Sequence, residues 1–231
     1  MQPESQNPSV QWGGNADVAV SQNKVLRNTY MLLAVSLVPT IFGALVGSQI
    51  NLSFLRTSPI ISALAVLAIF YGWIFMIEKN KNSSVGLYLL LGFTFFMGLL
   101  LTPLLQRTLG LANGGQLVMM AAGGTAAVFA VLSGIASNAK RDFSFLNKFI
   151  FVGFIVIMLG VVANIFLQMP LISLMLCGAF IVFSSAVILW QINDIVRGGE
   201  TNYISATLTL YVSIYNIFTS LLQILGIVDR D

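Results

Sequence analysis

Apolar residues fill seven long stretches of this chain, and polar and charged residues fall mainly between them. Each stretch approaches or exceeds the roughly 20 residues that a helix needs to cross a bilayer core about 30 Å thick. A helix also satisfies its backbone hydrogen bonds within its own segment, as hydrocarbon surroundings require. The pattern therefore predicts an all-α, polytopic membrane protein. Its seven transmembrane helices are expected at about 28–49, 58–78, 84–105, 115–137, 145–168, 171–195 and 203–227.

The segments between these stretches carry residues that typically begin or end helices. Pro59 precedes the second stretch, Asn113 and two glycines precede the fourth, and Pro170 separates the fifth from the sixth. Gly198-Gly199 follows the sixth stretch, and Thr201-Asn202 supplies N-cap candidates for the seventh. Glycine is common just after a helix and Thr or Asn just before one, so short turns are expected at these places.

The first 23 residues are polar, rich in Gln, Asn and Ser, and contain no lysine or arginine. A secretory signal peptide would need a basic start and a small-residue cleavage site. We therefore expect residues 1–23 to form a disordered cytoplasmic tail and residues 24–231 to form a single seven-helix transmembrane domain.

The few charged residues predict the orientation. Only 8% of the residues are charged, whereas a soluble domain carries about 25%, so these charges cannot cover a water-soluble fold. With seven spans, eight Lys and Arg fall on one side of the membrane and three on the other. The positive-inside rule then places the N-terminus in the cytoplasm and the C-terminus outside. The eight are Lys24, Arg27, Lys79, Lys81, Lys140, Arg141, Lys148 and Arg197, against Arg56, Arg107 and Arg230.

Histidine is absent from the chain, and Cys177 is the single cysteine. This composition excludes His-dependent catalytic triads, His switches and an intramolecular disulfide, and it leaves no usual ligand set for zinc. No basic patch with interleaved aromatic residues suggests nucleic-acid binding. We expect a non-enzymatic protein with no cofactor, no metal site and no nucleic-acid partner, whose surroundings are the lipid bilayer.

Polar residues form a stripe along the last predicted helix. At 100° per residue they fall within an arc of about 80° and span a rise of about 27 Å. A polar line of that length must face protein or water. It could line a pathway, or it could serve helix packing through cross-helix hydrogen bonds worth about 0.6 kcal/mol each. The stripe consists of Ser205, Thr209, Ser213, Asn216, Ser220 and Gln223.

Other polar and small residues also allow two interpretations. Asp194, near the end of the sixth stretch, could pair with Arg197, or it could form with Glu200 an acidic cytoplasmic mouth that attracts cations. Four amide side chains in the fifth and sixth stretches favour helix packing over ligand binding, and Gly43 and Gly47 have the small-xxx-small spacing of close helix contacts. The four amides are Asn164, Gln168, Gln191 and Asn193.

Four sequence segments resemble the Bax inhibitor/YccA family (the transmembrane Bax-inhibitor-motif proteins), and the bacterial YccA branch most closely. They are NKVLRNTY at 23–30, GVVANIF at 160–166, GGETNY at 198–203 and LYVSIYNIF at 210–218. The resemblance covers nearly all of the chain from about residue 23 onward.

This resemblance implies a bacterial inner-membrane protein whose seventh helix is central and surrounded by the other six. Family members are described as calcium leak channels gated by a pair of aspartates in the last two spans. The YccA branch is also known for modulating the membrane AAA protease FtsH, with involvement of the cytoplasmic N-terminal tail.

The chain departs from the family at the gate. Alignment of the motifs places Gln191 and Ser213 where the two aspartates are expected. Neither side chain titrates in the physiological range, so a pH sensor built on that carboxylate pair would be missing. We therefore expect a modulator or partner of an FtsH-type membrane protease. The alternative is a calcium or other cation leak channel with a neutral, pH-insensitive gate.

Overall fold

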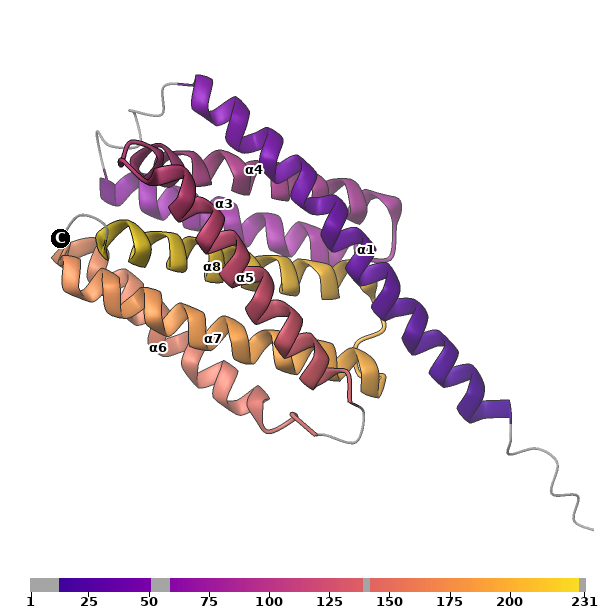
Figure 1. The fold of residues 1–231 in the computed structure, drawn as a ribbon. Coiled ribbons are helices and arrows are strands. Elements are labelled where there is room, and N and C mark those ends of the chain that lie inside the picture. Colours follow the sequence, from indigo (N-terminus) through magenta and orange to yellow (C-terminus); the bar gives the residue numbers. More distant parts are fainter. Residues whose placement is uncertain (1–12, 51–58, 139–141, 229–231) are drawn as a thin grey trace, which may run out of the picture.

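The computed structural model describes residues 13–50, 59–138 and 142–228, and these residues form seven helices and no strand (Figure 1). All seven helices are long and apolar enough to cross a membrane, which confirms the predicted fold class. They are α1 (Gly13–Gln49), α3 (Pro59–Lys79), α4 (Ser84–Leu109), α5 (Gly114–Ala136), α6 (Leu146–Leu167), α7 (Pro170–Arg197) and α8 (Tyr203–Val228).

The predicted helix ends agree with the structure to within two residues except at the end of α4 and the start of α1. Helix α4 runs four residues past its predicted end, to Leu109, although Pro103 lies within its last turns. A proline inside a membrane helix is tolerated because neighbouring groups can satisfy the carbonyl that it frees. The helix ends at Gly110, whose N–H donates to the carbonyl of Gln106 at 3.1 Å.

Helix α1 begins at Gly13, so residues 13–23, which the sequence assigned to a disordered tail, are helical. The division of the chain into a cytoplasmic tail and a single transmembrane domain stays a prediction. No proline lies between Gly13 and Pro39, so nothing in this stretch interrupts the helix once it has begun. The membrane-spanning part of α1 is Gln22–Gln49, and the turns before it extend past the ends of the other helices (Figure 1). The rest of the predicted tail, residues 1–12, lies outside the described residues.

Helix α8 lies at the centre of the bundle, where it contacts α1, α3, α4, α5 and α7. Its side chains form much of the core, and Tyr211, Leu210 and Ile217 are almost completely buried. The expected ring of six helices is only partly confirmed, because within the described residues α6 packs on α7 and α3 and not on α8. A cavity lined by α6, α7 and α8 separates α6 from α8.

Helices α1 and α4 pack against each other so closely that glycine is required at their contact. A Cβ at Gly43 would overlap the carbonyl oxygen of Phe95, and a Cβ at Gly98 would overlap that of Thr40. One turn further along, the Thr102 hydroxyl donates to the carbonyl of Ala44 at 3.3 Å. Gly43 and Gly47 of α1 therefore allow this helix to pack closely on α4, as the sequence predicted.

We predict that Gly98→Ala destabilises the protein by about 1–3 kcal/mol, because the added methyl must push two backbones apart. Gly72→Ala is the matched control, since a Cβ there meets nothing within 4 Å. The control should stay within about 1 kcal/mol of the unsubstituted protein or become more stable. Unfolding of both variants in an SDS titration, followed by circular dichroism, tests this; equal stabilities would contradict the close contact.

Candidate functional site

The outer half of the polar stripe lines a cavity of about 260 Å³ between α6, α7 and α8. The outer half here means the end of α8 towards Val228. Asn216, Ser220 and Gln223 of α8 face this cavity together with Asn164 of α6 and Ser173 of α7. These walls offer hydroxyl and amide groups in a region that the rest of the bundle fills with hydrocarbon, so the cavity suits water or a hydrated solute.

Asn164 links two helices beside this cavity. Its side-chain N–H donates to the Ser173 hydroxyl at 2.8 Å, which supports the packing role expected for this amide. Its Oδ1 atom is buried and has no hydrogen-bond partner among the described residues. A buried acceptor left unpaired costs about 1–3 kcal/mol, so a water molecule in the cavity is its natural partner.

The turn between α6 and α7 keeps these residues in register. Gln168 ends α6 in the left-handed conformation, with φ of 50°, and its N–H donates to the Asn164 carbonyl at 2.8 Å. Pro170 then begins α7, and proline is well suited to the first turn of a helix. The short connection holds Asn164 and Ser173 opposite each other.

The two positions aligned with the family's aspartates are buried and neutral. Ser213 is 4% exposed and Gln191 is 3% exposed. The Ser213 hydroxyl donates to the carbonyl of Thr209 on its own helix at 2.9 Å. The side-chain nitrogen of Gln191 has no acceptor among the described residues. The polar stripe is therefore closed to solvent just inward of the cavity.

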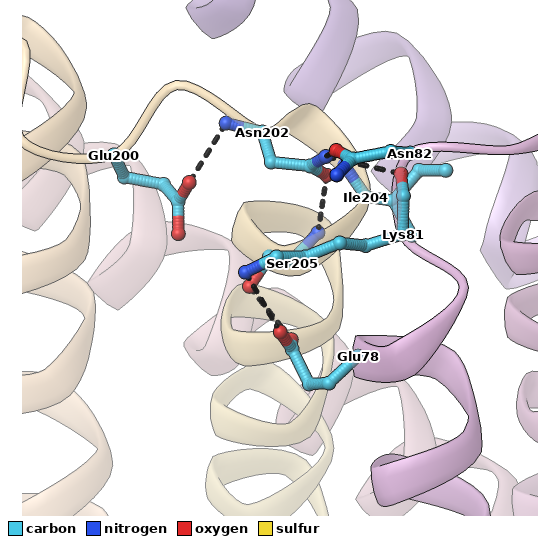
Figure 2. A network of polar contacts seen from close by, with 7 residues as sticks. All are labelled: Glu78, Lys81, Asn82, Glu200, Asn202, Ile204 and Ser205. Carbon is cyan, nitrogen blue, oxygen red and sulfur yellow. Dashed lines mark hydrogen bonds and ion pairs between the residues drawn. The ribbon is translucent and has the colours of Figure 1, made fainter.

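A polar network joins the start of α8 to the end of α3 (Figure 2). The Ser205 hydroxyl, the innermost member of the stripe, donates to Oε1 of Glu78 at 2.6 Å. The other oxygen of Glu78 pairs with the Lys81 ammonium at 3.1 Å. The hydrogen bond and the negative charge of Glu78 raise the pKa of Lys81 above its usual value. The inner end of the stripe is thus tied to a carboxylate.

Asn202 caps α8 within the same network, as the sequence suggested. Its Oδ1 accepts from the backbone N–H of Ile204 at 2.9 Å and of Ser205 at 3.2 Å. Its side-chain nitrogen donates to the Lys81 carbonyl at 3.0 Å, so the cap also holds the turn between α3 and α4 (Figure 2). Sequence reasoning missed Glu78 at this site, although its spacing of three from Lys81 is typical of a helical ion pair.

The predicted pairing of Asp194 with Arg197 is wrong. The Arg197 guanidinium pairs instead with Asp142, from the turn before α6, at 3.2 Å. Hydrogen bonds from Ser144 and the charge of Arg197 lower the pKa of Asp142 below its usual value. A contact between segments so far apart in sequence cannot be read from local spacing. Asp194 and Glu200 flank the turn that closes α7, and their role as an acidic mouth stays a prediction.

The remaining predicted amide, Asn193, also acts in packing. Its Oδ1 accepts from the backbone N–H of Phe143 at 3.2 Å, and its nitrogen donates to the Ala136 carbonyl at 3.2 Å. It therefore fastens the end of α5 and the following turn to α7. Among the described residues, no three acidic, His or Cys side chains come together as a candidate metal site.

These features define a polytopic helical membrane protein with a central, partly polar last helix. The sequence profile of the family described as "Inhibitor of apoptosis-promoting Bax1" matches residues 22–230. The chain therefore belongs to the Bax inhibitor family.

Two bacterial relatives are similar to the chain over most of its length. The chain is 42% identical over 212 residues to the Escherichia coli K12 protein named "Modulator of FtsH protease YccA", covering 92% of this chain and 94% of the relative. It is 45% identical over 208 residues to a protein of Neisseria meningitidis serogroup A, covering 89% of this chain and 92% of the relative.

We predict that a cysteine at Ser220 or Gln223 reacts with a water-soluble thiol reagent in lipid nanodiscs, in a Cys177→Ser background. Phe218→Cys is the control, because Phe218 lies on the opposite face of α8. Only the thiolate reacts, and hydrocarbon surroundings keep a thiol protonated, so the cavity positions should react at least about tenfold faster. Equal rates at Ser220 and Phe218 would show that the cavity is dry.

Proposed function

We propose that this protein is an inner-membrane partner and modulator of an FtsH-type membrane AAA protease, with its N-terminus in the cytoplasm and its C-terminus outside. The observation that carries the proposal is its 42% identity, over 92% of the chain, to the E. coli protein named as such a modulator. A second E. coli relative of the same identity is named an inner membrane protein. The proposed role is regulatory and needs no catalytic residue.

The shape of α1 supports this role. The turns of α1 before Gln22 stand clear of the bundle, where a large soluble protease domain could reach them (Figure 1). Lys24 and Arg27 lie just inside these turns, and Lys79, the last residue of α3, and Lys81, just after it, lie at the same end of the bundle. This excess of positive charge favours the cytoplasm for that end, which is where the protease domain of such an enzyme acts.

We predict that deleting residues 2–22 from the full chain lengthens its half-life in cells that hold the protease. It should also restore degradation of another membrane substrate that the intact protein slows. A Gly/Ser replacement of residues 2–22 at equal length is the control that separates the sequence of the segment from its length. Pulse-chase turnover measures both effects, and unchanged turnover of both proteins in the deletion variant would contradict the proposal.

A cation leak pathway is the second candidate function. The cavity favours this function, because the cavity places polar groups of three helices beside the stripe. It ends just outward of Gln191 and Ser213, the two neutral gate positions. Opening would require α7 and α8 to separate at Gln191 and Ser213. No carboxylate stands at either position, so the flux should not change between about pH 6 and 8.

Calcium flux into proteoliposomes tests this second function. We predict equal flux at the two pH values for the unsubstituted protein. The double variant Gln191→Asp/Ser213→Asp should acquire a pH dependence, because burial at both positions raises the pKa of an introduced carboxyl group towards this range. Gln191→Asn/Ser213→Asn is the neutral control. Absence of flux in the unsubstituted protein, or a steep pH response in it, would exclude a leak through a neutral gate.

A further inference from the structure

An apolar groove of about 510 Å³ lies between α1 and α5, with α8 as its floor. Helices α1 and α5 both pack on α8, but within the described residues their backbones do not approach each other. Their side chains meet where the rings of Tyr30 and Phe129 make an edge-to-face contact, with centroids 6.0 Å apart. This contact bounds the groove at the end towards the start of α1.

The floor of the groove is the face of α8 opposite the polar stripe. Tyr211, Ile214, Tyr215 and Phe218 line the groove. At 100° per residue, the centre of this set lies about half a turn around α8 from the centre of the stripe. Helix α8 therefore stands between a polar cavity on one side and an apolar groove on the other.

The hydroxyl groups along the groove are mostly used by the protein itself. Those of Thr40 and Tyr211 bond to each other at 2.7 Å, and the Tyr215 hydroxyl donates to the Met97 carbonyl at 3.2 Å. The Thr125 hydroxyl donates to the Ala121 carbonyl at 2.7 Å. The Tyr30 hydroxyl, at the bounded end, is buried and has no partner among the described residues. The body of the groove thus offers hydrocarbon surface to an occupant.

The position and length of the groove indicate what fills it. All of its lining residues lie within membrane-spanning segments, so the solvent at its mouth is lipid hydrocarbon and water gains nothing by entering. Along α1 the groove runs from Tyr30 to Ile41, a rise of about 16 Å. One leaflet of a hydrocarbon core about 30 Å thick has nearly the same depth.

We propose that this groove binds one acyl chain of a bilayer phospholipid against the aromatic face of α8. The chain lies along the groove and fills the gap that α1 and α5 leave over the central helix. Helix α8 also forms a wall of the polar cavity. An acyl chain in the groove packs against the opposite face of α8 and so favours the closed arrangement at Ser213. The site would act whether or not a protease is bound.

A substitution that fills the groove tests the proposal. Ala126 lines the groove, whereas its exposed neighbour Ala127 on α5 does not. Ala126→Phe should exclude the chain, and Ala127→Phe is the matched control. The full chain is placed in nanodiscs of phosphatidylglycerol and phosphatidylethanolamine doped with a phospholipid that carries a photoreactive diazirine in its acyl chain. Crosslinked peptides are then located by mass spectrometry.

In the unsubstituted protein and in Ala127→Phe, crosslinks should appear on Ile214 and Phe218 of α8. In Ala126→Phe they should fall about tenfold, the change that 1.4 kcal/mol of lost binding produces. Ala34→Phe fills the groove from the α1 wall and should act alike, which keeps the test valid if one variant misfolds. Equal crosslinking in Ala126→Phe and Ala127→Phe, or none on α8 in the unsubstituted protein, would overturn the proposal. So would a copurifying protein crosslinked at the groove in place of lipid.

Discussion

The polar face of α8 is the constraint on which the rest of the bundle depends. Its hydroxyl and amide groups cannot face lipid without losing hydrogen bonds that hydrocarbon does not replace. The least apolar of the seven spans therefore occupies the centre, and α6, the most apolar, lies at the periphery with little of its surface buried. Along the stripe, Ser205 bonds to Glu78 of α3, Ser213 bonds to its own backbone, and Asn216, Ser220 and Gln223 face the outer cavity. The order of the helices follows from where these groups can be satisfied.

Two different surroundings meet at this central helix. On one side lie the amides and hydroxyls of the cavity, and on the other lie Tyr211, Tyr215 and Phe218 at the groove. The contact between α1 and α4 is fixed by glycine backbones, whereas α6 is held off α8 by the cavity. The bundle is therefore tightly packed between α1 and α4 and more open between α6 and α8. Any opening movement would begin on the open side.

The sequence predicts the fold well because bilayer thickness and backbone hydrogen bonding leave few choices for an apolar stretch. The Gly43 and Gly47 pair and the Asn202 cap were also predictable, since each depends on local spacing. The partner of Arg197 was not, because Asp142 comes from a distant turn. Glu78 was missed at the site because a carboxylate at a helix end gives no sign of which other helix it will contact. The gap between α6 and α8 likewise arises only from three-dimensional packing.

The unbroken course of α1 has a mechanical consequence. A helix of 37 residues is a rod about 55 Å long, and it joins the protruding N-terminal turns directly to the glycine contact with α4. A force applied to the N-terminal end is not absorbed by a flexible hinge, since the helix is continuous across the membrane boundary. It acts along the axis of α1 and loads the interlocked backbones at Gly43 and Gly98 together. The contact therefore opposes a displacement of α1 along its axis, although it lies far from the point where the chain is pulled.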